Sequence, residues 1–269
     1  MPPAKPLVLT EPEQIAEFYR RHYWDNMKVA EGAAIDTAFW MNAFLSYIQL
    51  FGNYETPDVE PVKEALQRIG DDKGKMDLMS MMAENILYDP TSPYRNEEFY
   101  IPFLEARISS GLYDEADVTR DRHRLSLVTQ NRLYHKANDI KYTLKDGSQG
   151  TLYGIKAPYT LIFINNPGCG MCEQVRSQMC ATPALMRLVD EGIVRILAVY
   201  PDEELDEWHE HYDEIPSDWI NSYDKGGLMR RNGTYRLDAI PSLYLLDADK
   251  NVLVKDGTDV EQIMRKIRI

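Results

Sequence analysis

The sequence has few cysteines, and all of them lie close together. Its 269 residues include three, Cys169, Cys172 and Cys180, within one short segment. A protein held together by disulfides spreads its cysteines along the chain, because a bridge stabilises most when it closes a long loop. The absence of distant cysteines excludes a disulfide scaffold and indicates local chemistry, either redox or metal binding.

Long apolar runs are also missing. No stretch of about 18 apolar residues is present, so the sequence predicts no membrane-spanning helix. The N-terminus begins Met1-Pro2-Pro3 and has no apolar core of a signal peptide. Two interpretations stay open: a cytoplasmic protein, or an exported protein whose export segment is absent from this sequence.

Clusters of basic residues are absent as well. The chain carries a net charge of −13, and no stripe of Lys and Arg interrupts its acidic composition. Nucleic-acid binding needs such clusters to neutralise phosphates, and an anionic lipid surface would repel this chain. No glycine-rich phosphate loop is found either. We therefore predict no nucleic-acid partner and no organic cofactor.

The first half of the sequence is predicted to be an all-helical domain over residues 1–137. Apolar residues recur at helical spacing, and capping residues such as Thr10 and Asp114 precede the segments. The Met-rich stretch 76–82 is predicted to be the packing face of a helix. The predicted helices cover about 10–27, 36–51, 56–70, 75–88, 92–111 and 114–137.

The second half, residues 138–269, changes to strands that alternate with helices, which is typical of an α/β sheet. Asp146-Gly147 is a hairpin turn signal, and Tyr159–Ile164 is a nearly continuous apolar run, as expected of a buried central strand. The predicted strands cover about 140–144, 150–153, 159–164, 193–200, 242–246 and 252–255. The predicted helices cover about 172–191, with a bend at Pro183, 203–212 and 259–267.

Cys169 and Cys172 are the candidate catalytic residues because of where the pair falls. It follows the buried strand and a short turn, and it opens a helix. Free amide groups and the positive end of the helix dipole favour a thiolate at that position. Cys169 is the predicted nucleophile, and Cys172, one turn further into the helix, is the predicted resolving thiol.

Two other interpretations of the pair are weaker. A structural zinc needs four ligands, and the one close histidine pair, His209 and His211, lies some forty residues away in an acidic run. A static disulfide across so short a loop adds little stability. We therefore expect no metal site, a solvated helix face for the acidic run, and a small buried hydrophobe at Cys180.

Two segments resemble the thioredoxin superfamily, and more narrowly the TlpA/ResA-type envelope thioredoxins. One runs Thr160-Leu-Ile-Phe-Ile-Asn-Asn-Pro-Gly-Cys-Gly-Met-Cys, and the other contains Ala239-Ile240-Pro241-Ser242 before an apolar strand. The likeness covers about residues 138–269. It implies a thioredoxin-like α/β domain, with a central mixed sheet flanked by helices, after the all-helical domain.

The resemblance also implies a substrate-binding surface. In this family the proline at the position of Pro241 is cis and faces the cysteine pair, and the backbone of the preceding residue, here Ile240, pairs with the substrate. Gly170 and Met171, between the cysteines, complete the expected surface.

One departure from the family concerns proton transfer. Phe163 stands where thioredoxin carries a buried acid. The adjacent Glu173 is the candidate for proton handling, although a Glu on the first turn of a helix is more often a solvated partner of the dipole.

The resemblance implies a thiol–disulfide oxidoreductase that reduces, oxidises or isomerises protein disulfides. Its expected partners are client proteins and a redox partner protein, and its expected location is the cell envelope or periplasm. For the helical domain three roles stay open: client binding, covering of the active site, and homodimer formation. The alternative is a non-enzymatic envelope protein-binding module that keeps the thioredoxin-like half as a scaffold.

Overall fold

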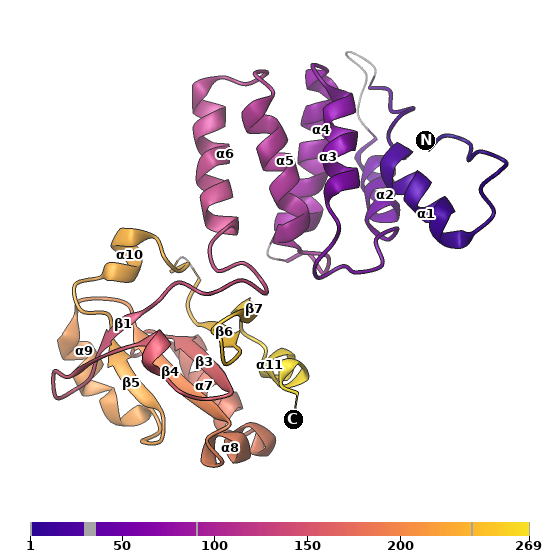
Figure 1. Ribbon diagram of the computed structural model, residues 1–269. Helices are drawn as coiled ribbons and strands as arrows, with labels where there is room; N and C mark the ends of the chain where they lie inside the picture. The colour runs from indigo at the N-terminus through magenta and orange to yellow at the C-terminus, as the bar shows by residue number, and fades with distance from the viewer. Residues whose placement is uncertain (1, 30–35, 90, 238, 269) are drawn as a thin grey trace. The chain divides into compact units, whose positions relative to one another are not determined.

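The computed structural model describes residues 2–29, 36–89, 91–237 and 239–268. The chain divides into two compact units, Met1–Thr129 and Gln130–Ile269, each with its own hydrophobic core (Figure 1). Helices make up the first unit, and a mixed seven-stranded sheet with flanking helices makes up the second. This arrangement confirms the predicted fold class. Among the described residues, no helix combines the length and the apolar character needed to span a bilayer.

The helices of the first unit begin where short polar side chains cap them. Asp36, Asp72, Asn96 and Asp114 each accept a hydrogen bond from the backbone amide three residues further on, which satisfies an amide that the helix leaves free. The elements are α1 (Pro12–His22), α2 (Thr37–Ile48), α3 (Glu60–Ile69), α4 (Lys73–Ala83), the π-helix η1 (Glu84–Tyr88), α5 (Glu97–Ser109) and α6 (Glu115–Val128).

Aromatic and methionine side chains form the core of the first unit. Met76, Met79 and Met82 of α4 are buried, which confirms that the Met-rich stretch is a packing face. Phe44 of α2 and Phe103 of α5 meet with their ring centroids 5.7 Å apart. In Figure 1, α4, α5 and α6 lie side by side, and neighbouring helices in this group pack against one another.

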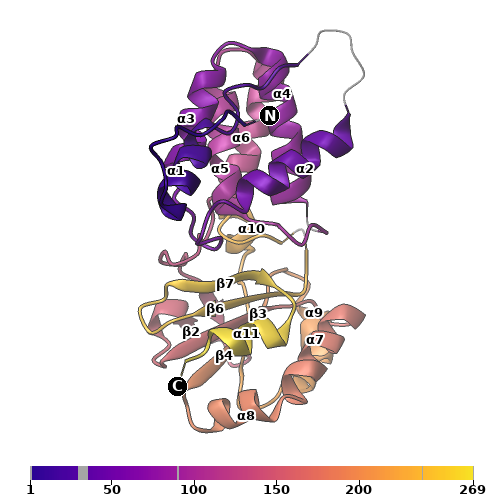
Figure 2. The same cartoon turned by 90° about the vertical axis from the view of Figure 1, so that its right-hand side faces the viewer.

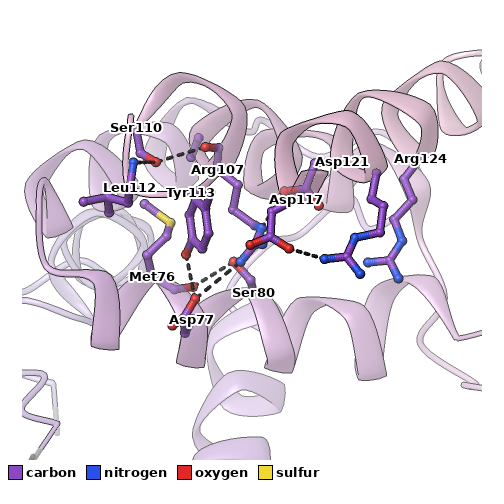
Figure 3. Close-up of polar contacts among 12 residues, drawn as sticks. Met76, Asp77, Ser80, Arg107, Ser110, Leu112, Tyr113, Asp117, Asp121 and Arg124 are labelled. Carbon is purple, nitrogen blue, oxygen red and sulfur yellow. Dashed lines mark hydrogen bonds and ion pairs between the residues drawn. The ribbon is translucent and has the colours of Figure 1, made fainter. Parts of the chain in front are cut away.

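A cluster of charged side chains ties three of these helices together (Figure 3). Arg107 of α5 donates through Nε to Oδ2 of Asp121 on α6 at 2.8 Å, and its Nη1 lies 3.5 Å from Oδ1 of Asp77 on α4. The Tyr113 hydroxyl donates to the same Asp77 oxygen at 2.7 Å, and its ring lies under the Arg107 guanidinium. Because Asp121 is buried, its carboxylate would be an unpaired buried charge without the positive charge of Arg107.

Helix α6 ends at Val128 rather than near Ala137, as the sequence had suggested. Asn131 and Tyr134 adopt positive φ values of 46° and 60°, which a helix cannot contain. The amides of Tyr134 and Ala137 donate to the carbonyls of Val252 and Lys250. These hydrogen bonds make the residues after Thr129 part of the second unit. The division between the units therefore lies before the predicted boundary near Asn138.

The sheet of the second unit has the strand order β2-β1-β5-β4-β3-β6-β7. Figure 2 shows its strands β6 and β7 side by side. Strand β3 lies in the interior of the sheet, parallel to β4 and antiparallel to β6. Strand β5 is parallel to β4, and the β1–β2 hairpin and β7 lie at the edges. The strands are β1 (Lys141–Thr143), β2 (Gln149–Thr151), β3 (Tyr159–Ile164), β4 (Val194–Tyr200), β5 (Ile220–Tyr223), β6 (Ser242–Leu246) and β7 (Val252–Gly257).

Alternate residues of the central strands point to opposite faces of the sheet, so each face has its own core. Leu161 and Phe163 of β3 belong to one cluster and Ile162 and Ile164 to the other. The helices of the second unit are α7 (Gly170–Cys180), α8 (Pro183–Asp190), α9 (Leu205–Glu210), α10 (Leu228–Asn232) and α11 (Val260–Lys266). Residues of α7, α8 and α11 complete the first cluster, and Met229 of α10 belongs to the second.

Two features of this unit differ from the sequence expectation. The segment 172–191 forms two helices, because Pro183 has no amide hydrogen and disfavours helical backbone at Thr182. Strand β5 and helix α10 were not predicted. Strand β5 is short and partly polar, and its buried Asn221 and Ser222 are accommodated by hydrogen bonds to Trp208 and Ala198 that no sequence pattern reveals.

Candidate active site

Cys169 occupies the N-cap of α7, at the end of a short loop from the central strand. Strand β3 ends at Ile164, and the loop turns at Gly168, whose φ of +66° favours glycine. The Cys169 sulfur accepts the amide of Cys172 at 3.4 Å. The sequence therefore places a thiol where a helix offers free amide donors.

Cys172 lies one turn further into α7 and is only 4% exposed. Its sulfur accepts the backbone amide of Asn166 at 3.4 Å, so the loop before the helix supplies a hydrogen bond to the buried thiol. Both cysteines are present as free thiols. One thiol of the pair is thus half-buried and the other is enclosed.

The surroundings shift the pKa values of the two thiols in opposite directions. Burial opposes ionisation of Cys169, but hydrogen bonds from the Cys172 thiol and from the amides of Cys172 and Met171 outweigh it and lower the pKa of Cys169. Burial, and then the hydrogen bond to Cys169, raises the pKa of Cys172 to about 12. Cys169 is the thiol that ionises first, as a nucleophile must.

The Ile240–Pro241 peptide bond is cis. The register of β3 and β6 pairs Ile164 with Ser242, so Pro241 lies beside the start of the loop that leads to Cys169. Pro241 is buried and Ile240 is half-buried. Gly170 and Met171 are exposed, and Met171 shows 59% of its surface. Cys169 and Cys172 thus follow the end of β3, and Ile240 and Pro241 precede the paired start of β6.

A pocket of about 240 Å³ opens beside the two cysteines, between α7 and the segment that contains α9. Most of the residues that line this pocket were not predicted as site residues from the sequence. His211 and Glu214 come from the acidic run that was expected to be only a solvated face, and Arg176 comes from α7. The spacing of three residues between His211 and Glu214 was the available signal, but nothing in the sequence placed them next to the cysteines.

The remaining sequence candidates fall in different places. Glu173 is exposed and lines the same pocket. Cys180 is exposed, so the expectation of a buried hydrophobe is wrong. Cys180 is the last residue of α7, where the helix turns this side chain away from the core. Among the described residues, no three His, Cys, Asp or Glu side chains are grouped as the ligands of a metal would be.

Comparison with known proteins places both units. Residues 2–131 match a family described as a domain of unknown function (DUF5106). A thioredoxin-like protein from Bacteroides caccae, whose crystal structure is known, is 38% identical, with 98% of this chain and 96% of that chain covered and a TM-score of 0.82.

The C-terminal domain of an uncharacterized protein from Bacteroides fragilis is 43% identical. That match covers 50% of this chain and 96% of that one, with a TM-score of 0.49. No match is found among curated proteins. The similarity to the B. caccae protein spans both units, and the chain therefore belongs to the thioredoxin-like proteins, with a DUF5106 domain at its N-terminus.

Proposed function

We propose that this protein is a thiol–disulfide oxidoreductase that exchanges its Cys169–Cys172 dithiol with disulfides of client proteins. The observation that carries the proposal is the asymmetry of the pair. Cys169 is half-buried with a lowered pKa, and Cys172 is buried with a pKa raised to about 12. A static structural thiol pair does not require its two thiols to differ in burial and pKa. Thiol exchange does, because one thiol attacks as a thiolate and the other resolves the mixed disulfide later.

The reaction proceeds in two exchanges. The Cys169 thiolate attacks one sulfur of the client disulfide, and a mixed disulfide forms while the other client sulfur leaves as a thiolate. Cys172 then loses its proton and attacks the Cys169 sulfur, and the client leaves with the electron pair. The client gains two electrons and two protons, and the protein is left with a Cys169–Cys172 disulfide. A redox partner protein reduces that disulfide again, and the reverse sequence oxidises a client.

The client would bind across the surface of the exposed Gly170 and Met171 and the half-buried Ile240, next to the buried Pro241. Met171 offers an exposed, flexible apolar side chain next to the nucleophile, and such side chains adapt to varied partners. The backbone of Ile240 precedes the first residue of β6, where an extended client segment can add its own hydrogen bonds. A location in the cell envelope stays a prediction from the resemblance.

Trapping tests this proposal. In a Cys180→Ser background, Cys172→Ser should accumulate mixed disulfides with client proteins, because the attacking thiol remains and the resolving thiol is gone. Cys169→Ser is the matched control and should trap few, since Cys172 is buried and ionises poorly. Equal and negligible trapping by both variants would contradict the proposal and favour a binding module on a thioredoxin-like scaffold.

A further inference from the structure

The resolving step needs a group that takes the proton of Cys172, and the position that serves this purpose in thioredoxin is apolar here. Phe163 of β3 lines the pocket beside the cysteines. Cys172 is buried and its pKa is raised to about 12, so very little thiolate is present at neutral pH without a base. A titratable group elsewhere on the pocket wall has to supply that base.

We propose that His211, oriented by Glu214, is the base that accepts the Cys172 proton during resolution of the mixed disulfide. This inference rests on the proposed function, because it assigns a step of the same exchange reaction. His211 lies at the C-terminal end of α9, and Glu214 ends the short helix η3 (Tyr212–Glu214). Three residues apart in such a turn, the two side chains fall on the same side.

The contacts of His211 fix which nitrogen is basic. Its Nδ1 lies 2.6 Å from Oε1 of Glu214, and Oε2 of Glu214 accepts Nη1 of Arg176 at 2.8 Å. A carboxylate can only accept, so Nδ1 of the neutral imidazole must carry the proton and Nε2 holds the lone pair. Arg176 lies one turn after Cys172 on α7. It thereby orients Glu214, and Glu214 orients His211.

The free nitrogen points toward the loop of the nucleophile. Nε2 of His211 lies 3.8 Å from the position that a Cβ on Gly168 would occupy, and Gly168 precedes Cys169. His211, Cys169 and Cys172 line the same pocket of about 240 Å³, which has room for several water molecules at about 30 Å³ each. A proton can therefore pass from Cys172 to His211 through water.

The charges around His211 suit a base that works near neutral pH. The hydrogen bond from His211 to Glu214 raises the pKa of the imidazole, and desolvation opposes this only in part. The other charged or titratable groups that face the histidine or line its pocket are Glu207 and Glu210 of α9, Glu173 and Arg176 of α7, and the two thiols. Glu173 remains exposed, and no ion pair or hydrogen bond of its side chain orients it among the described contacts.

In the resolving step the Cys172 thiol gives its proton to Nε2 of His211, and the new thiolate attacks the sulfur of Cys169. The Cys169–Cys172 bond forms, the bond between Cys169 and the client breaks, and the client sulfur leaves with the electron pair. The imidazolium then protonates that client thiolate and returns to the neutral state. No further oxidant or reductant is required.

The experiment uses the full chain with Cys180→Ser and a substoichiometric dipyridyl disulfide, whose thiopyridone product absorbs light. Attack by Cys169 releases the first thiopyridone, and resolution by Cys172 releases the second. His211→Gln should slow the second release about 10-fold or more at pH 7 and change the first by less than about 3-fold. His209→Gln is the matched control, since His209 is exposed on the same helix and does not line the pocket. It should change neither phase.

The pH profile separates proton transfer from a structural effect. With His211 present, the resolution rate should rise with pH and level off above the pKa of the imidazole. Glu214→Gln should move that rise to lower pH, because the carboxylate is what raises the pKa of His211. His211→Gln should remove the plateau. Resolution in His211→Gln at the wild-type rate and with the wild-type profile would overturn this inference alone, whereas a wild-type protein that releases only one thiopyridone would overturn the proposed function.

Discussion

Cys169 should react with an alkylating agent about a hundredfold faster than Cys172 in the reduced, folded protein. The perturbation is limiting iodoacetamide at pH 7, which modifies thiolates. Cys169 is half-buried at the start of α7 and its pKa is lowered, while Cys172 is 4% exposed. The two sites are three residues apart, so the contrast is produced by local surroundings.

The magnitude follows from the fraction of thiolate at each site. An ordinary thiol with a pKa of about 8.5 is about 3% ionised at pH 7. The lowered pKa of Cys169 raises its thiolate fraction, so about 3% serves as its order of magnitude. Burial and the neighbouring thiol raise the pKa of Cys172 to about 12, which leaves roughly one thiolate in 10⁵ at pH 7. A more basic thiolate is a better nucleophile, and this raises the reactivity of the Cys172 thiolate about 40-fold relative to that of Cys169. The net preference for Cys169 is therefore about 10².

Mass spectrometry of peptides, with fragmentation between the two cysteines, measures the two modification rates. Protein unfolded in denaturant is the control, because the two thiols should then react at similar rates. Modification of Cys172 in the folded protein as fast as that of Cys169 would refute the reasoning from helix position and burial.

The remaining predictions concern the supports of the two units. Gly168→Ala should lower the free energy of unfolding by about 1–2 kcal/mol, because a side chain at a φ of +66° is strained. Arg107→Met should lower it by about 3–5 kcal/mol, because the carboxylate of Asp121 stays buried without its partner. Arg122→Met, which breaks an exposed pair of α6, should change it by less than about 1 kcal/mol. Urea unfolding measures all three free energies.

Two outcomes of these unfolding measurements would contradict the structure. A Gly168→Ala protein as stable as the parent would mean that the loop before Cys169 does not require its left-handed conformation. Equal losses for Arg107→Met and Arg122→Met would mean that the cluster in Figure 3 is no more enclosed than a surface ion pair.

The hydrophobic pattern predicted most elements, because burial of alternate or helically spaced side chains is recorded in the sequence itself. Strand β3 begins and ends at the predicted residues, Tyr159 and Ile164. The first helix begins at Pro12 without the predicted cap from Thr10, since its N-cap is Glu11 and no side chain closes the turn. Helix boundaries of this kind depend on single hydrogen bonds, which a pattern of apolar residues does not record.

The site was predictable where residues adjacent in sequence act together, and it was not where the chain returns from a distance. The cysteine pair and its helix are local, so their chemistry follows from position. Arg176 and Glu214 form an ion pair although they are 38 residues apart, and the segment of His211 and Glu214 is followed by β5, a short strand with polar residues. Polar elements of this kind leave little trace in a hydrophobic pattern.

The most direct test of the account is a redox titration of the Cys169–Cys172 couple in glutathione buffers, read by thiol alkylation and mass spectrometry on the Cys180→Ser protein. We predict a reversible two-electron transition, with a potential of about −270 mV marking a reductant and one of about −120 mV an oxidant. Absence of any reversible disulfide between Cys169 and Cys172 would contradict the proposed exchange activity.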